Sequence, residues 1–357
     1  MSFTYIDSAN KTGRRRFFGA ATGLVTLGLL FGGCASTVPD SNETGSPAKL
    51  QSLVVGNGSG LVSEPYVRWA ESRGFFGEDI MQVDNVPGGS SAERVAALVG
   101  GSADVMSMSI SDLFLAAANA GFEATIVAGG YGVSPEQIQD ALTLPEYEGK
   151  LILETALVVT PGLDVSNLGN LDSLKIGVRS PSASTTLGLQ IFISENYTNP
   201  PRLELTPFKN QNDSLSALLA GDVDGSLLSG ALAHQAISEG MKLVTYPLAY
   251  WAESGPFTLW VTTPETAEKK ETELLLFREA MLRVAQELNE PESLAPFREF
   301  LKSEYQLSDE ALDQTTIPPL VEEEFGFSDL AWVSRRLLDS GQINEAVAQD
   351  SIEFLVR

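Results

Sequence analysis

Residues 97–104, Ala-Leu-Val-Gly-Gly-Ser-Ala-Asp, return 120 residues later (217 minus 97) as 217–224, Ala-Leu-Leu-Ala-Gly-Asp-Val-Asp. In both copies an amphipathic helical pattern ends on a glycine, which can adopt the left-handed conformation that closes a helix. An aspartate follows three residues after that glycine and opens a short apolar run. Each copy therefore predicts a helix, a tight turn and a buried strand.

Both predicted strands break into small polar residues, Ser107-Met108-Ser109 in the first copy and Ser229-Gly230 in the second. In an open α/β sheet, ligands bind beyond the carboxyl ends of the strands. Two such units predict two α/β lobes whose serine-rich strand ends face each other across a cleft. The alternative is a chance recurrence of common residues, or two unrelated helix–strand turns inside one domain.

The composition restricts the classes of function. The chain of 357 residues is long enough for two domains, and its formal net charge of −24 opposes binding to nucleic acid or to an anionic membrane surface. A solvated acidic surface explains the same charge. A single cysteine excludes an internal disulfide, and a single histidine, His234, excludes a multi-histidine metal site. His234 lies on a helical face without a nucleophile motif, so we expect no enzyme, metal or cofactor.

The first 33 residues have the form of an export signal. Arg14-Arg15-Arg16-Phe17-Phe18 precede a glycine-rich apolar segment that is too short for a membrane span. The arginine pair resembles a twin-arginine signal. Leu30–Cys34 resembles a bacterial lipoprotein processing site, at which Cys34 would be lipidated, although Phe31 departs from the usual small aliphatic residue. A plain signal peptide or an uncleaved anchor is the alternative. Residues 34–48 are predicted to be a flexible tether.

From Leu50 the sequence predicts alternating strands and helices. The apolar runs 153–159 and 257–262 are the predicted crossovers between the lobes, and the second should return the chain to the first lobe. From Pro264 onward the pattern is helical and is predicted to pack on the outside of that lobe. The remaining predicted strands are 50–55, 80–83, 124–127, 175–178, 202–205 and 243–245.

Several short motifs occur in a fixed order along the chain: Pro65-Tyr66, Arg73-Gly74-Phe75-Phe76, Pro87-Gly88-Gly89, 97–105, 171–178 and 338–343. Their order and spacing resemble the substrate-binding proteins of ABC importers of the nitrate/sulfonate/taurine type, which include thiamine-precursor binders. The resemblance covers roughly residues 50–350, and no single motif in it is decisive.

The resemblance implies a two-lobed, periplasmic-binding-protein-like α/β fold (type II), with two doubly wound sheets joined by a hinge. Lobe I would comprise residues 49–155 and 256–357, and lobe II residues 156–255. Together with the signals at Arg14, Arg15 and Cys34, the resemblance implies an exported, lipid-anchored monomer, in the periplasm or at the cell surface. It would bind a small anionic molecule by hinge closure and deliver it to the permease of an ABC importer. A sensor or scavenging lipoprotein and an exported enzyme of the same fold are the alternatives.

The turn at residues 179–186 is the main candidate for ligand binding. It joins a buried strand to a helix, so its backbone N–H groups and hydroxyls lie at a positive helix end. Ser182, Ser184 and Thr185 suit a small anion, and Arg179 could be its charged clamp. Capping of the helix by Ser182 or Ser184 is expected as well, and Arg179 could instead form a surface ion pair.

Other strand ends and connections supply further candidates for ligand contact: Asn57, Ser59, Ser107, Ser109, Ser229, Tyr131 and Trp251. The aromatic rings could stack on a ligand. Each polar residue could instead serve only as a turn or cap residue, and each aromatic residue only as core.

Overall fold

A computed structural model of the protein describes residues 51–57, 63–77, 80–143, 147, 149–252, 255–313, 315–322 and 324–355. These residues belong to a compact unit at 49–357. The predictions made for Arg14, Arg15, Cys34 and Ser59 lie outside the described residues.

The first sheet belongs to lobe I. Within the described residues it has the strand order β13-β4-β12-β3-β1-β2. Only β12 runs antiparallel to its neighbours, and it is the strand predicted to return the chain to the first lobe. The short strand β13 was not predicted. The strands are β1 (Gln51–Asn57), β2 (Met81–Pro87), β3 (Val105–Ser109), β4 (Ala124–Gly129), β12 (Thr258–Thr262) and β13 (Ile352–Phe354).

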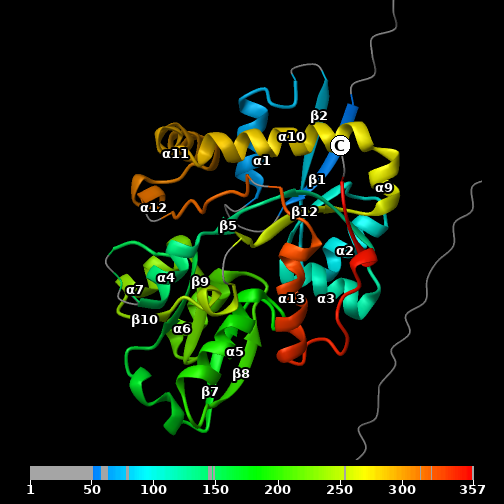
Figure 1. Cartoon of the computed structure of the whole chain (residues 1–357). Coiled ribbons are helices and arrows are strands. Elements are labelled where there is room, and N and C mark those ends of the chain that lie inside the picture. The colour runs from blue at the N-terminus through cyan, green and yellow to red at the C-terminus, as the bar shows by residue number, and fades with distance from the viewer. Residues whose placement is uncertain are drawn as a thin grey trace, which may run out of the picture. The chain divides into compact units, whose positions relative to one another are not determined.

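Helices from both ends of the unit cover this sheet. The long helix α10 packs on β1, β4 and α1, and α13 packs on α3, so the C-terminal chain lies on lobe I as predicted (Figure 1). Phe277 of α10 anchors this contact through Phe76, with ring centroids 6.0 Å apart, and Trp260, at 5.2 Å. The helices are α1 (Glu64–Ser72), α2 (Ser91–Val99), α3 (Ile110–Ala120), α9 (Pro264–Lys269), α10 (Glu271–Leu288), α11 (Pro291–Tyr305), α12 (Asp309–Asp313) and α13 (Phe327–Asp339); the 3-10 helix η2 (Gln349–Ser351) precedes β13.

The second sheet belongs to lobe II. Its order, within the described chain, is β10-β6-β9-β7-β8, and only β6 runs antiparallel to its neighbours. The run 153–159, predicted as a crossover, thus contributes β6 to the interior of this sheet. The strands are β6 (Thr155–Val159), β7 (Ser173–Val178), β8 (Arg202–Pro207), β9 (Gly225–Ser229) and β10 (Lys242–Thr245). The helices of this lobe are η1 (Val165–Asn170), α5 (Ser184–Asn196), α6 (Gln211–Ala220), α7 (Gly230–Ser238) and α8 (Leu248–Trp251). The helix α4 (Pro135–Thr143) precedes the predicted start of lobe II at residue 156 and packs on α8.

Two short segments pair where the chain leaves and re-enters lobe I. β5 (Gly132–Val133) follows β4, β11 (Gly255–Pro256) precedes β12, and the two pair antiparallel. A Cβ on Gly132 would lie 2.7 Å from the carbonyl oxygen of Gly255, so this close approach requires glycine. The outgoing and returning chains are therefore hydrogen-bonded together at the crossover.

The repeated aspartates form equivalent hydrogen bonds in the two lobes. Asp104 accepts a hydrogen bond on Oδ2 from the backbone N–H of Val54 at 2.8 Å, and Asp224 accepts one on Oδ2 from Lys175 N–H at 2.8 Å. The glycines that end the two helices have φ of +69° and +75°, as the capping pattern predicted. The repeat therefore builds an equivalent helix–turn–strand unit in each sheet, which confirms the prediction of two similar α/β lobes.

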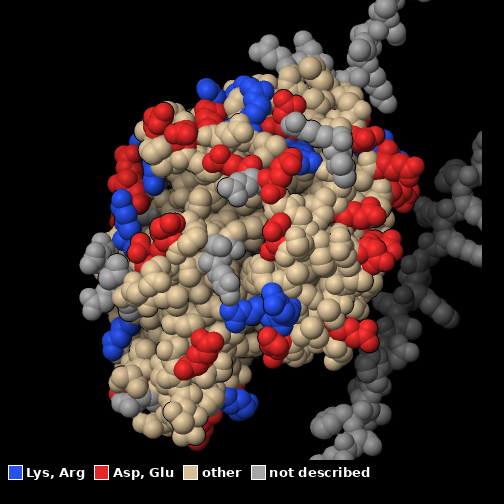
Figure 2. Space-filling view, viewed as in Figure 1, with Lys and Arg blue, Asp and Glu red and all other residues tan. Residues whose placement is uncertain are grey.

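The acidic side chains are spread over the surface seen in Figure 2 rather than gathered in one patch. Several form exposed ion pairs, such as Arg68 with Glu64 (3.6 Å). Pairs of this kind contribute at most about 1 kcal/mol each. None of the helices in the described ranges is both long and apolar enough to cross a membrane.

Candidate functional site

The N-termini of two helices from opposite lobes meet at one place. The Ser111 hydroxyl of α3 and the Ser184 hydroxyl of α5 are hydrogen-bonded at 2.5 Å, and both residues are buried. The first N–H groups of a helix lack partners within it, and the helix dipole makes this end positive. Two such ends facing each other across the lobes create a region that favours negative charge.

The start of α5 differs from the prediction. The cap position is Ala183, with φ −62° and ψ 142°, and no side chain caps this helix within the described residues. Ser184 is the first helical residue, and its hydroxyl is engaged with Ser111. The Ser182 hydroxyl is hydrogen-bonded to that of Ser180 at 2.9 Å. Helix capping by Ser182 or Ser184 is therefore wrong. Thr185 is half-buried in the first turn.

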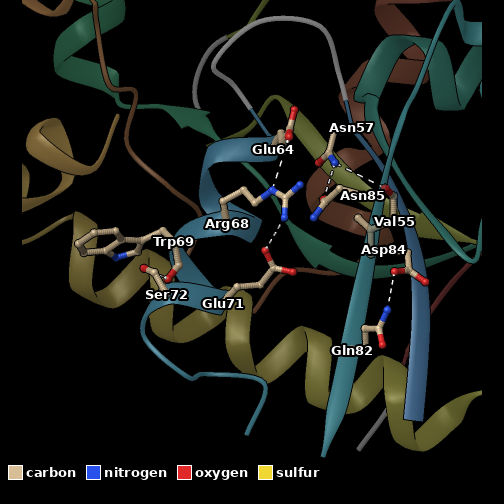
Figure 3. A network of polar contacts seen from close by, with 10 residues as sticks. All are labelled: Val55, Asn57, Glu64, Arg68, Trp69, Glu71, Ser72, Gln82, Asp84 and Asn85. Carbon is tan, nitrogen blue, oxygen red and sulfur yellow. Dashed lines mark hydrogen bonds and ion pairs between the residues drawn. The ribbon is translucent and has the colours of Figure 1, made fainter. Parts of the chain in front are cut away.

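Asn57, at the carboxyl end of β1, is buried beside Asn85 of β2. Its Nδ2 donates to Asn85 Oδ1 at 2.7 Å and to the Val55 carbonyl at 3.5 Å (Figure 3). Asn57 Oδ1 and Asn85 Nδ2 have no hydrogen-bond partner among the described residues. An unpaired buried donor and acceptor destabilise the free protein, and a polar ligand group could satisfy both.

Arg94 of α2 supplies a buried positive charge in lobe I. It is 6% exposed, and its Nη1 donates to the carbonyl of Ser107, the candidate on β3, at 2.9 Å. Within the described part of the chain it forms no ion pair, and its Nε has no partner. Burial, followed by the positive charge of Arg179, lowers the pKa of Arg94, while Asp112 opposes this. Arg179 is exposed and directly follows β7. The guanidinium groups of Arg94 and Arg179, one from each lobe, therefore place positive charge in the same region.

Two carboxyl groups lie in the same region. Burial raises the pKa of Asp112, and a hydrogen bond from Ser109 and the charges of the two arginines oppose the rise. Ser109 itself caps α3, because its hydroxyl accepts from the Asp112 N–H at 3.2 Å. Burial raises the pKa of Glu154 to about 7, against the opposing charge of Arg179 and a hydrogen bond from Tyr131. The Tyr131 hydroxyl donates to Glu154 Oε2 at 3.5 Å.

Two predicted contact residues are engaged in internal interactions. The Ser229 hydroxyl is hydrogen-bonded to the Thr155 hydroxyl at 2.7 Å and accepts from Gln211 Nε2 at 3.1 Å. Trp251 is fully buried and packs edge-on against Trp332 of α13, with ring centroids 6.0 Å apart. In this structure Trp251 joins the two lobes and does not offer its ring to a ligand.

Two surface hollows of about 460 and 950 Å³ lie on α10 and between α13 and β13. Among the described residues, no buried side-chain atom without a partner lines either hollow. No group of three or more His, Cys, Asp or Glu in the described ranges is placed to hold a metal ion. The residues between the lobes are therefore the best candidate site.

Sequence reasoning missed Arg94, Ser111 and Glu154. Two signals were present. Glu154 is the only charged residue in the apolar run 151–159, where an unpaired carboxylate is costly. Arg94 lies one helical turn before the buried Leu98, so it shares the inward face of α2. Ser111 carried no signal, because its partner Ser184 is 73 residues away.

The fold and the interlobe site place the chain in the class of two-lobed, periplasmic-binding-protein-like α/β structures, as the sequence predicted. No protein-family model matches the chain, and no curated protein matches it.

Solved structures share this fold at low sequence identity. The alkanesulfonate-binding protein SsuA from Xanthomonas axonopodis pv. citri, bound to MOPS, aligns with a TM-score of 0.64 and 12% identity over 86% of this chain and 99% of that one. A ligand-binding component of an ABC-type import system from Staphylococcus aureus aligns with a TM-score of 0.65 and 12% identity over 85% and 96%. A Candida albicans protein with the generic periplasmic binding protein fold aligns with a TM-score of 0.60 and 14% identity over 85% and 96%.

Proposed function

We propose that this protein is an exported, lipid-anchored solute-binding protein that captures a small anionic molecule between its lobes and delivers it to an ABC importer. In this proposal residues 49–155 and 256–357 form lobe I, residues 156–255 form lobe II, and the crossover acts as the hinge. Cys34 carries the lipid, and Arg14 and Arg15 direct export. The site binds its ligand without chemical conversion.

One observation indicates that the ligand is an anion. Arg94 is buried without a carboxylate in ion-pair contact among the described residues, although the chain has twice as many acidic as basic residues, 47 against 23. A buried guanidinium with an unpaired N–H is costly unless a partner arrives. Arg179 and the N-terminus of α5 approach from the other lobe. An anion bound here would satisfy groups of both lobes only when the lobes are closed.

The names of the similar proteins support the same role. The Xanthomonas protein is called alkanesulfonate-binding, and an Escherichia coli neighbour with a TM-score of 0.60 and 12% identity is called a periplasmic aliphatic sulphonate binding protein. A sulfonate is a small anion with three acceptor oxygens, which suits a guanidinium pair and two helix N-termini.

The test is a binding screen followed by one substitution. Purified full chain is screened by thermal shift against small sulfonates, carboxylates, phosphonates and nitrate, and the best ligand is titrated by calorimetry. Arg94→Gln should weaken its binding by about tenfold or more, because a hydrogen bond to a charged group is lost (about 1.5–3 kcal/mol). Arg335→Gln, an exposed arginine on α13, is the control for net charge. Equal affinity of wild type and Arg94→Gln would refute the anion site.

A further inference from the structure

Trp251 and Trp332 form a contact between the lobes that uses none of the groups assigned to the ligand. Trp251 is the last residue of α8 in lobe II, and Trp332 lies in α13 of lobe I. Their rings meet edge to face with centroids 6.0 Å apart; Trp251 is fully buried and Trp332 is half-buried. Aromatic rings in this geometry attract each other beyond the effect of the apolar area that they bury. The contact therefore stabilises the closed arrangement of the lobes whether or not a ligand is bound.

Each tryptophan is fixed to the helix that bears one of the two interlobe serines. In lobe I, α13 packs on α3 through Phe327 and Phe114, whose rings stack with centroids 6.0 Å apart (Figure 1). In lobe II, α8 packs on α5 so closely that a Cβ on Gly188 would collide with the Pro247 carbonyl oxygen. The tryptophan contact and the serine hydrogen bond therefore join the same two rigid units. An opening that separates α3 from α5 also separates the tryptophans.

A single peptide group forms a second bridge outside the ligand site. The carbonyl of Leu151 accepts a hydrogen bond from Thr316 Oγ1 at 3.3 Å, and the N–H of Ile152 in the same peptide group donates to the Tyr246 hydroxyl at 3.2 Å. Thr316 belongs to the C-terminal chain of lobe I, and Tyr246 directly follows β10 of lobe II. The C-terminal chain therefore contacts the crossover as well as α8.

The closed arrangement also buries groups that oppose closure. Trp251 Nε1 and Arg94 Nε are buried and have no hydrogen-bond partner in the part of the chain that the structure describes. Water can satisfy such an N–H once the lobes open, and the energy of one unpaired N–H is similar to that of one aromatic contact. A bound anion would compensate Arg94. Without a ligand the opposing effects nearly balance, so open and closed forms should coexist.

Building on the hinge closure proposed above, we infer that Trp332 is a positioning residue: through Trp251 it keeps part of the ligand-free protein closed and so sets the affinity for every ligand. A ligand that binds only the closed form has an apparent affinity that rises with the fraction of protein already closed. Trp332 raises this fraction without touching the ligand. Its loss should weaken all ligands by the same factor, whereas the effect of a change at Arg94 depends on the charge of the ligand.

Distance measurements on the ligand-free protein test this inference. Spin labels are attached after Glu123→Cys and Glu195→Cys, at exposed positions of lobe I and lobe II, in the full chain with Cys34→Ser. The protein is unfolded in urea and refolded to remove any ligand that copurifies. Pulsed electron paramagnetic resonance should then detect two distances, one of which matches the closed lobes. Trp332→Ala should lower the ratio of closed to open protein by about twofold to tenfold, as expected for the loss of one aromatic pair.

Two further variants separate this role from a purely structural one. Phe325→Ala is the matched control, because Phe325 and Phe354 form an aromatic pair at 5.8 Å within lobe I. Both alanine variants should lower the free energy of unfolding in urea, but only Trp332→Ala should change the ratio of the two distances. Trp332→Phe keeps a ring against Trp251 and should restore most of the closed fraction.

The outcomes distinguish this inference from the proposed function. An equal ratio of closed to open protein in Trp332→Ala and in the unchanged chain would overturn the inference. An equal loss of closed protein in Phe325→Ala, or only the open distance in the unchanged chain, would do the same. These measurements contain no ligand, so they decide the role of Trp332 independently of the anion. Failure of every screened anion to bind would overturn the proposed function alone.

Discussion

Replacing Glu154 by glutamine should make the ligand-free protein more stable at pH 8. Burial raises the pKa of this carboxyl group from 4.5 to about 7, because the buried position disfavours the charged form. A pKa that is higher in the folded than in the unfolded state means that ionisation destabilises the fold. The destabilisation is complete above pH 7 and absent below about pH 4.5, and the difference between the two pKa values corresponds to about 3 kcal/mol. Glutamine keeps the shape and can still accept the Tyr131 hydrogen bond.

Urea unfolding followed by circular dichroism measures this effect. The free energies of unfolding of wild type, Glu154→Gln and Glu310→Gln are compared at pH 8, 6.5 and 4.5. The advantage of Glu154→Gln over wild type should be about 3 kcal/mol at pH 8, smaller at pH 6.5 and near zero at pH 4.5. Glu310 is exposed on α12, so its variant should follow wild type at each pH. An advantage that does not change with pH, or a less stable variant at pH 8, would refute a raised pKa at Glu154.

Two further predictions concern the contacts that join the lobes. Ser111→Ala and Ser184→Ala should each weaken ligand binding by about twofold to tenfold, because each removes the same interlobe hydrogen bond. The double variant should lose no more than either single one, and additive losses in calorimetric titrations would contradict the shared contact. Trp251 packs on Trp332 between lobes, so opening should expose both rings and saturating ligand should shift tryptophan emission to shorter wavelength. Trp332→Phe should remove most of this emission shift. An unchanged shift would show that ligand binding does not alter the contact between Trp251 and Trp332.

The sequence predicted the parts of the fold that depend on local pattern. The two capped helices and the aspartate turns follow from periodicity, glycine and the repeat. The return of β12 to the first sheet was predicted from the apolar run 257–262 together with the family resemblance. The strand β13 could not be predicted in this way. It has only three residues, and its pairing with β4 joins parts of the chain far apart in sequence. The crossover pair β5 and β11 was missed for the same reason.

The candidate site was less accessible to sequence reasoning than the fold. Hydroxyl-rich turns mark strand ends, and they led correctly to the region where Ser184 lies. They gave no information on whether a hydroxyl caps its own helix or contacts the other lobe, because that depends on how the lobes meet. A charged residue inside an apolar pattern is a better predictor of a binding site than a hydroxyl-rich turn, since a buried ion requires a partner. Arg94 and Glu154 are both of this kind.

The repeat also shows where specificity resides. The position 120 residues after Arg94 is Ser214, which is buried and hydrogen-bonded to the Ser226 hydroxyl at 2.5 Å. The same helix position is therefore a buried cation in lobe I and an internally satisfied hydroxyl in lobe II, although the flanking aspartates act identically. Because Arg94 has no counterpart charge in lobe II and the shared aspartates hold the strands together, changes at Arg94 should alter ligand binding with little effect on the fold. Changes at Asp104 or Asp224 should lower the stability of the fold with little effect on ligand binding. Each aspartate links neighbouring strands of its own sheet, and neither is among the groups assigned to the ligand.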